Sequence, residues 1–213
     1  MKMVLFGATG HVGRAILNEA VARGHAVTAV VRDAARLGVV PESVRVVVGD
    51  VAQPATWREA VRGQDAVIAS LSARRDGNHD LLAVHAQAFI DNLPAVGVTR
   101  LVWVGGAGSL EVAPGVRVVD TPDFPAAWRD EALGQGKALE VFRARGDALD
   151  WVYVSPAALL DDAEPKGHCR VGGEQLLVDA QGNSHIGVID YAAGLLDQLD
   201  RPEVTRRRIT LAD

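Results

Sequence analysis

The first half of the chain alternates short apolar runs with stretches in which apolar residues recur every three to four positions. Short runs at residues 3–6, 26–31, 44–48 and 66–69 predict four strands. The helical spacing over residues 12–22 predicts an amphipathic helix, which Gly24 is well placed to end. Strands that alternate with helices in this way predict a parallel sheet with helices on both faces.

The same alternation continues into the second half and then changes. The pattern predicts a helix over 80–95, a strand over 101–104, a helix over 128–145 and a strand over 151–154. Residues 157–185 are rich in Gly and Asp and show no long period, so we expect loops and short strands at 175–178 and 185–188. A helix at 191–199 and a last strand at 208–211 complete the chain.

Composition narrows the class of protein. The 213 residues are 48% hydrophobic but only 5% aromatic, so we expect a core of Val, Leu and Ala, which suits strands buried on both faces. The formal net charge of −5 argues against nucleic acid as a partner, and the Arg206-Arg207-Arg208 run is read as a solvated strand start. Cys169 is the only cysteine, which excludes an intrachain disulfide and fits a reducing cytoplasm.

Signals for targeting, membranes and metals are weak. The apolar N-terminal stretch is too short for a signal peptide, and no segment approaches the roughly 20 apolar residues of a membrane span. The six histidines show no metal-ligand spacing. We therefore expect a cytoplasmic monomer or homodimer that binds a small-molecule acceptor, without a metal and without membrane or nucleic-acid partners.

The most informative segment is the loop Gly7-Ala8-Thr9-Gly10-His11-Val12-Gly13, between the first strand and the first helix. In this context three glycines permit a tight turn, a close approach to a pyrophosphate, and helix–strand packing. The alternative is a glycine turn without a ligand. The loop predicts an α/β fold, a Rossmann-type doubly wound parallel sheet with a small C-terminal cap region. We expect a single domain, 1–213, with substrate-side elements mainly at 106–127 and 157–188, and expect cofactor contacts at Gly7, Thr9, Gly10, His11, Val12 and Gly13.

The end of the second strand selects the cofactor. Arg32 lies 25 residues beyond Gly7, where a guanidinium can pair with the 2′-phosphate of NADP. Arg14 and Arg36 are candidate helpers. The neighbouring Asp33 leaves NAD as an alternative, and a solvated surface arginine is the other interpretation of Arg32.

After the third strand, Asp50 is a candidate for the adenine amino group, with Val51 packing on the ring. The competing interpretation of this Gly49-Asp50-Val51 segment is a plain turn with an Asp helix cap.

These motifs resemble a known family. The chain is similar to the atypical short-chain dehydrogenase/reductases, and most of all to the NAD(P)H-binding group that includes NADH-flavin reductases, biliverdin reductase B and NmrA-like proteins. The resemblance spans essentially the whole chain and rests on Gly-Ala-Thr-Gly-x-x-Gly at 7–13, Val-Arg at 31–32, Gly-Asp-Val at 49–51, Gly-Gly-Ala-Gly-Ser at 105–109, Ser-Pro-Ala at 155–157 and Asp-Tyr at 190–191.

The resemblance also implies catalytic residues and shows where the pattern breaks. It implies that Ser109 and Lys137 are catalytic, as parts of a Ser and Tyr-x-x-x-Lys set. The position four before Lys137 is Leu133, which has no proton to donate, and neither Tyr153 nor Tyr191 replaces it by spacing. Hydride transfer to a flavin needs stacking more than a protein acid, because solvent can supply the proton.

The nicotinamide end is expected at the carboxyl ends of the middle strands. This places Ser70, Leu71, Ser155 and Pro156 among the cofactor contacts, with 106–127 as a substrate loop and Trp128 at its edge. The leading hypothesis is an NAD(P)H-dependent reductase of a flavin-like or other planar acceptor. The alternatives are a non-catalytic NADP-sensing module of NmrA type and a nucleotide-sugar epimerase or dehydratase.

Overall fold

A computed structural model describes residues 1–74, 76–201 and 203–213. Its main sheet has the strand order β10-β12-β8-β5-β4-β1-β2-β3, and every pairing is parallel except that of β10 with β12. These strands are β1 (Lys2–Phe6), β2 (Ala26–Val31), β3 (Val44–Val48), β4 (Ala66–Ala69), β5 (Arg100–Val104), β8 (Asp150–Ser155), β10 (Arg170–Gly172) and β12 (Arg207–Ala212).

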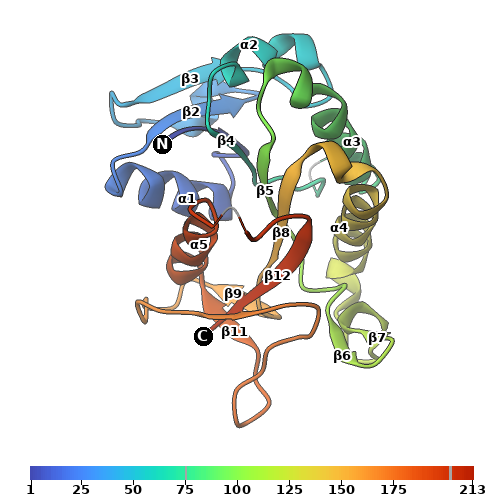
Figure 1. Ribbon diagram of the computed structural model, residues 1–213. Helices are drawn as coiled ribbons and strands as arrows, with labels where there is room; N and C mark the ends of the chain where they lie inside the picture. The colour runs from blue at the N-terminus through green and yellow to red at the C-terminus, as the bar shows by residue number, and fades with distance from the viewer. Residues whose placement is uncertain (75, 202) are drawn as a thin grey trace.

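Helices cover both faces of this sheet (Figure 1). One face carries α1 (His11–Ala22) and α5 (Val188–Asp197), and the other carries α3 (Leu81–Asn92) and α4 (Ala126–Arg145), with the short α2 (Arg58–Val61) beside them. Five 3-10 turns join these elements: η1 (Ala34–Leu37), η2 (Pro54–Thr56), η3 (Pro94–Val96), η4 (Val118–Asp120) and η5 (Gly146–Ala148). The predicted α/β class, a Rossmann-type doubly wound sheet, is confirmed.

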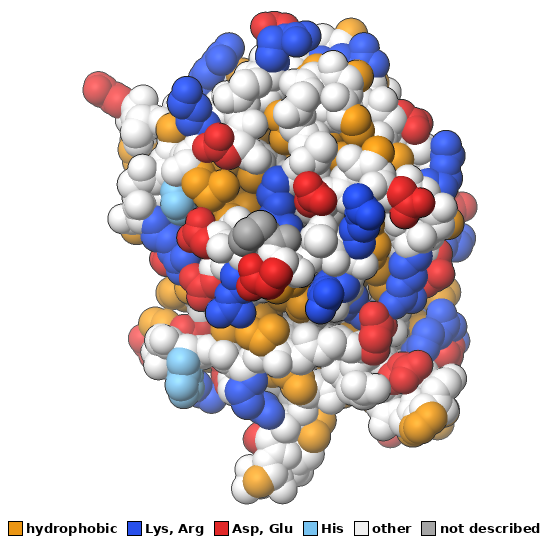
Figure 2. All heavy atoms as spheres, in the orientation of Figure 1, with side chains coloured by type: hydrophobic (Ala, Val, Ile, Leu, Met, Phe, Trp, Pro, Cys, Tyr) orange, Lys and Arg blue, Asp and Glu red, His pale blue; other side chains and the backbone are white. Residues whose placement is uncertain are grey.

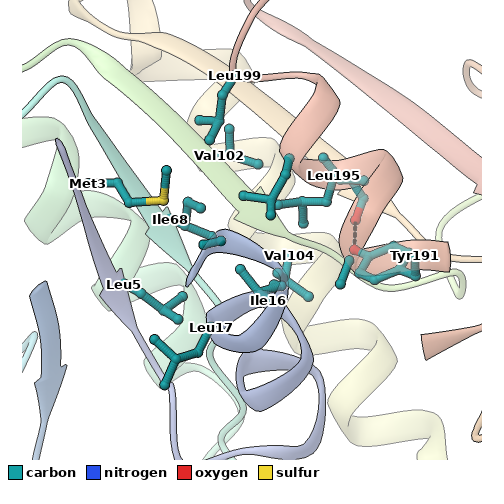
Figure 3. Packing of buried hydrophobic residues seen from close by; sticks show 14 of the residues in the cluster. Met3, Leu5, Ile16, Leu17, Ile68, Val102, Val104, Tyr191, Leu195 and Leu199 are labelled. Carbon is teal, nitrogen blue, oxygen red and sulfur yellow. Dashed lines mark hydrogen bonds between the residues drawn. The ribbon is translucent and has the colours of Figure 1, made fainter. Parts of the chain in front are cut away.

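Each central strand sends alternate side chains into two hydrophobic clusters. Met3 and Leu5 of β1 join the cluster under α1 and α5, where Figure 3 shows Met3 beside Ile68 and Leu5 beside Leu17. Val4 and Phe6 join the cluster under α3 and α4. Because both faces are buried, the strand reads as a continuous apolar run rather than an alternating one.

The aromatic residues are few but concentrated on one face. A chain of ring contacts with centroids 4.9 to 6.3 Å apart runs through Phe6, Trp57, Phe89, Trp103, Phe142 and Trp151. The α1/α5 side is built mainly from aliphatic residues, as composition predicted. Aromatic rings therefore fix how α3 and α4 sit on the sheet.

The segment after β8 departs from expectation. Residues 175–178 are not a strand. Only Gln175 forms an isolated bridge, to Glu111, while the edge strand of the main sheet is β10 (Arg170–Gly172). The chain bends after β10 so that Leu177 packs over Gly172, where a Cβ would lie 2.9 Å from its Cδ2. Two small sheets complete the fold: β9 (Leu159–Asp161) with β11 (His185–Gly187), and β6 (Glu111–Ala113) with β7 (Val116–Arg117).

The topology creates a crevice at one edge of the sheet. The strand order reverses between β1 and β4, and a parallel sheet binds ligands at such a switch point, beyond the carboxyl ends of its strands. Basic and acidic side chains are interspersed over the face seen in Figure 2. Among the described residues, no helix is both long enough and apolar enough to span a membrane.

Candidate functional site

The glycine loop has a shape that side chains at two of its positions would destroy. Gly7 adopts φ +85°, and a Cβ there would lie 1.8 Å from the carbonyl oxygen of Ser70 on the neighbouring strand end. A Cβ at Gly13 would lie 2.1 Å from the carbonyl oxygen of Gly7. The loop therefore packs its backbone directly against β4 and against the first turn of α1, as a dinucleotide-binding loop does.

The start of α1 is open to an anion. Gly10 caps the helix without a side-chain hydrogen bond, and Arg14 is the first residue of the helix whose amide bonds back, to Gly10 at 2.9 Å. Within the described part of the chain, no protein acceptor takes the amides of His11, Val12 and Gly13. Three free donors at the positive end of a helix dipole form a site for a diphosphate.

Beside the loop lies a first cavity of about 280 Å³, which we call the basic cavity. It contains many of the predicted cofactor residues, together with some that sequence reasoning missed. Its lining includes Gly7, Thr9, Gly10, Arg32, Asp33, Arg36, Asp50, Val51, Ser70, Leu71, Arg74, Asp76 and His85. Three arginines and a helix N-terminus make its ligand chemistry that of a phosphorylated nucleoside.

Arg32 lies at this cavity, as predicted, but it already has a partner. Its Nη1 donates to Oδ1 of Asp76 at 2.9 Å, and its side chain remains 53% exposed. Asp33 is engaged locally, because its Oδ1 accepts the amide of Ala35 at 2.9 Å and caps η1. Of the two expected helpers, Arg36 lines the cavity, whereas Arg14 donates to the carbonyl of Leu37.

The segment after β3 shows one of its two expected roles directly. Asp50 closes a turn, since its Oδ1 accepts the amide of Ala52 at 2.9 Å and its own amide donates to Thr56 Oγ1 at 3.0 Å. It also lines the basic cavity together with the buried Val51. The turn is therefore confirmed, but the expected Asp helix cap is wrong, because Gln53 and not Asp50 precedes η2 and no side chain caps that turn. The contact with adenine remains a prediction.

His85 is a cavity residue that the sequence analysis missed. It projects from α3, and its Nδ1 is buried without a hydrogen-bond partner in the described structure. Burial lowers the pKa of this imidazole, and the nearby charge of Asp50 partly opposes that effect. A neutral ring with an unused nitrogen is suited to contact a base or a ribose.

A second cavity of about 520 Å³ continues from the first, and we call it the apolar cavity. The two share Gly10, Ser70, Leu71, Ser72 and Arg74 in their walls. Of the other predicted contacts, His11, Val12 and Pro156 line it. Further walls come from Val104, Phe124, Trp128, Glu131, Ala132, Gln135, Ala157, Leu159 and Leu160. A cofactor that spans both cavities would place its ring end among these mostly apolar side chains.

Ser155 does not line either cavity. Its side chain is fully buried, and its Oγ donates to the carbonyl of Gly106 at 2.9 Å. This bond ties the end of β8 to the loop after β5. Ser155 therefore supports the wall of the apolar cavity without lining it, and Pro156 and Ala157 form the wall.

The two residues that the resemblance implied as catalytic are also placed elsewhere. Ser109 Oγ accepts from Arg208 Nη1 at 2.8 Å, and Lys137 Nζ lies 2.5 Å from Asp80 Oδ1 on an exposed surface. Neither lines the basic or the apolar cavity. At about 100° per residue, the face of α4 that carries Trp128 and Gln135 lies nearly opposite Lys137, which explains the difference.

Both tyrosines are structural. Tyr153 donates its hydroxyl hydrogen to the carbonyl of Gln135 at 3.0 Å and accepts the amide of Gly106 at 3.1 Å. Tyr191 donates to the carbonyl of Val154 at 2.7 Å, seen as the dashed line in Figure 3. Burial raises the pKa of both phenols well above the usual value. The loss of the family's tyrosine at Leu133 is therefore not compensated by another phenol.

One hydrogen-bonded carboxylate does face the apolar cavity. Glu131 lines this cavity, and its Oε2 lies 2.7 Å from Nδ1 of His79, two residues before α3 begins. Gln135, one turn further along α4, accepts from Trp103 Nε1 at 2.9 Å and donates to the carbonyl of Leu71 at 3.1 Å. In the described residues, no cluster of three or more His, Cys, Asp or Glu side chains is arranged to hold a metal ion.

The glycine cradle, the free amides of α1 and the paired cavities fit a nicotinamide dinucleotide, which makes this a dinucleotide-binding Rossmann protein. Residues 7–202 match the NAD(P)H-binding family, and the chain belongs to this family of atypical short-chain dehydrogenase/reductases.

Relatives with known sequences or structures support the assignment. "Uncharacterized protein YwnB" of Bacillus subtilis (strain 168) is 37% identical over 214 residues, which cover 99% of this chain and 98% of that protein. A "putative epimerase" from Bacteroides thetaiotaomicron is 37% identical, with a TM-score of 0.89 over 99% of this chain and 96% of the other. A "putative NADH-flavin reductase" from Streptococcus pneumoniae TIGR4 is 32% identical, with a TM-score of 0.89 over 100% and 99%.

Proposed function

We propose that this chain is an NADP(H)-dependent oxidoreductase that reduces a flavin-like or other planar acceptor. The observation that carries the proposal is the junction of the two cavities at Gly10 and Ser70. A dinucleotide whose diphosphate lies on the amides of α1 would extend its adenosine into the basic cavity. Its nicotinamide would then reach the apolar cavity, beside any acceptor bound there.

The choice of NADP over NAD is supported by charge at the basic cavity. Arg32, Arg36 and Arg74 line it, and guanidinium groups bind phosphate in a forked geometry. Asp33, the carboxylate that would favour the ribose hydroxyls of NAD, has one oxygen occupied by the amide of Ala35. A 2′-phosphate at this end would find three cations within its cavity.

The choice of a planar acceptor is supported by the apolar cavity. Its volume of about 520 Å³ lies in the range of small-molecule sites, and its walls are mostly apolar. Phe124 and Trp128 both line it, and Trp128 is 46% exposed. A partly exposed indole at the cavity wall is suited to stack on a flat ring.

Bound NADPH supplies a hydride, and the protein supplies position and environment. The amides of His11, Val12 and Gly13 hold the diphosphate, which fixes the nicotinamide relative to the sheet edge. Leu71, Pro156 and the other apolar walls exclude water from the space between donor and acceptor.

The test is to mix purified protein with NADPH and either FMN or FAD under anaerobic conditions and follow the nicotinamide absorbance band. We expect oxidation well above the uncatalysed rate, and Trp128→Ala should raise the KM for flavin by about tenfold through lost stacking. Val116→Ala, on the exposed β6–β7 hairpin outside both cavities, is the matched control. Oxidation no faster than without protein would reject the proposal.

A second candidate function is a redox-sensing module that binds NADP without turning it over. The observation in its favour is that both tyrosine side chains are buried and that both hydroxyls donate their hydrogen to backbone carbonyls. Equal affinity for NADPH and NADP⁺, with no turnover of any acceptor, would favour this candidate. Preferential binding of NADPH accompanied by flavin reduction would favour the enzyme.

A further inference from the structure

A carboxyl–imidazole pair lies at the wall of the apolar cavity. No sequence motif predicts this pair. Glu131 on α4 lines the cavity with a side chain that is only 12% exposed. Its Oε2 lies 2.7 Å from Nδ1 of His79, whose side chain is 21% exposed. A hydrogen bond of this length holds one carboxyl oxygen in place, and among the described residues the other oxygen has no hydrogen-bond partner.

Helix α4 packs closely against His79. A Cβ at Gly134 would lie 2.6 Å from the carbonyl oxygen of His79 and 2.8 Å from its Cβ, so only glycine allows the approach. Trp128, Glu131 and Gln135 share the face of α4 that looks into the cavity, since residues three, four and seven apart align on a helix. Gln135 is fixed at both ends of its amide, which locks the rotation of the helix.

Few ionisable side chains line the apolar cavity besides Glu131. Among the described residues that line the apolar cavity, it is the one carboxylic acid, and the other ionisable groups are His11, Arg74 and Tyr191. His11 lies 3.3 Å from the exposed Asp162, and the hydroxyl of Tyr191 is committed to a backbone carbonyl. Arginine does not release a proton in proteins.

We propose that Glu131 is the proton donor to the acceptor, and that His79 is the residue that positions it. The inference rests on the proposed function, because it needs an acceptor in the apolar cavity. His79 donates its Nδ1 hydrogen to Oε2, which leaves Oε1 to carry the proton that is transferred. The family's missing tyrosine at Leu133 is thereby replaced by a carboxylic acid two residues earlier, on the face that the helix turns inward.

The step balances as NADPH + acceptor + H⁺ giving NADP⁺ + reduced acceptor. Hydride transfer places two electrons and one hydrogen on a neutral acceptor, such as a quinone, and leaves it with one negative charge. Glu131 breaks its O–H bond to neutralise that charge and becomes a carboxylate, which the Nδ1 hydrogen of His79 stabilises. The carboxylate regains a proton from solvent once the reduced product leaves.

The test compares two acceptors that differ in their need for a proton. Menadione, a neutral naphthoquinone, requires a hydride and a proton, whereas the cationic dye methylene blue becomes neutral on accepting a hydride alone. With NADPH as donor, Glu131→Gln should slow menadione turnover on the order of 100-fold while changing methylene blue turnover less than about twofold. Glu140→Gln, an exposed carboxylate on the same helix, is the control and should change neither.

Two readouts independent of turnover accompany this comparison. NADPH affinity, measured by nicotinamide fluorescence, should stay within about twofold in Glu131→Gln, because the residue lies in the acceptor cavity and not in the basic one. Side-chain ¹⁵N shifts should show His79 with hydrogen on Nδ1, and this signal should move in Glu131→Gln. In a separate measurement of turnover, His79→Gln should lower kcat about tenfold with KM unchanged, as expected of a positioning residue.

The outcomes separate this inference from the proposed function. If the wild-type protein oxidises NADPH with neither acceptor, the proposed function fails and this inference with it. If the wild-type protein turns over both but Glu131→Gln slows neither, or slows both equally, Glu131 is not a proton donor while the reductase stands. Wild-type turnover of methylene blue alone, or loss of NADPH binding in Glu131→Gln, would also overturn the inference.

Discussion

Arg32 and Asp76 form an ion pair at the basic cavity, with Nη1 of the arginine 2.9 Å from Oδ1 of the aspartate. The side chain of Arg32 is 53% exposed and that of Asp76 is 28% exposed, so water screens the pair and its contribution to folding is small. The ion pair matters instead for ligand binding. A phosphate that binds Arg32 must compete with a carboxylate already in place.

Removal of this competitor should tighten binding of NADPH. Asp76→Asn should lower the Kd for NADPH about threefold, because an exposed ion pair of this kind is worth up to about 1 kcal/mol. Arg32→Ala should raise the Kd for NADPH by roughly 10- to 100-fold through the loss of charged hydrogen bonds to phosphate, and should barely change that for NADH. Isothermal titration calorimetry with both dinucleotides gives these constants.

The control for the charge change is Asp91→Asn, which alters an exposed carboxylate near Arg145, outside both cavities. Its affinity for NADPH should match the wild-type value. If Arg32→Ala weakened NADPH and NADH equally, the arginine would serve the dinucleotide in general and the assignment of NADP would be wrong.

The glycine loop allows a matched test of steric demand. Gly7 and Gly24 have nearly the same backbone angle, with φ +85° and +75°, so alanine at either position costs a similar strain of about 1 kcal/mol. Only at Gly7 would the added Cβ also collide, at 1.8 Å from the carbonyl oxygen of Ser70, while Gly24 has nothing within 4 Å. Gly7→Ala should therefore lose several kcal/mol more in urea unfolding, and should bind NADPH at least tenfold more weakly. Equal losses in the two variants would contradict this packing.

Much of the fold could be predicted because its signals are local. After the exposed Lys2, strand β1 is apolar, since Met3 and Val4 enter opposite clusters, and the glycine loop marks the first turn. The edge strand β10 could not be predicted, because it is defined by pairing with β12 some 40 residues away. Residues 175–178 carry a strand-like pattern but fold back over Gly172, which no local pattern specifies.

The residues of the site that follow local sequence signals could likewise be predicted. Arg32 follows a strand end, and its position depends only on its neighbours along the chain. The face that α4 presents depends instead on Gly134 meeting His79, a contact between segments 55 residues apart. Spacing within a motif therefore pointed to Lys137 and missed Glu131. His85 was missed because only the packing of α3 over the sheet edge brings it to Asp50.

Stability should depend on pH through His185. Its Nδ1 lies 2.6 Å from Oδ2 of Asp213, and its Nε2 lies 2.9 Å from Oδ1 of Asp161. Hydrogen bonds to these two carboxylates raise the pKa of the imidazole above 6.5. The bond with His185 lowers the pKa of Asp161 below 3.8. Burial raises the pKa of Asp213, but the bonds with Lys166 and then His185 outweigh burial and bring it below 3.8. The histidine's contribution is complete below pH 6.5 and is lost as the pH rises through its higher folded pKa. The carboxylates contribute above pH 3.8 and lose their effect as the pH falls through their lower folded values.

The cluster should therefore stabilise the fold most between about pH 4 and 6.5. Comparison of urea unfolding for wild type and His185→Gln across pH 4 to 9 measures this. The difference between the two proteins should be largest near pH 5 and should shrink toward pH 9. A difference that is independent of pH would mean that His185 acts through packing alone.

Ser109 is expected to matter for folding and not for turnover. Its hydroxyl oxygen accepts from Nη1 of Arg208, a guanidinium whose side chain is only 2% exposed and which also pairs with Glu174. Ser109→Ala leaves a buried charged donor without this acceptor and should cost about 1.5–3 kcal/mol in urea unfolding. Thr99→Ala, which removes an exposed hydroxyl bonded to Asp150, should cost less than about 0.5 kcal/mol. Because Ser109 lines neither cavity, kcat of Ser109→Ala with NADPH and FMN should stay within about twofold of the wild-type value. A loss of 100-fold or more would mean that Ser109 has the catalytic role that the family resemblance implied.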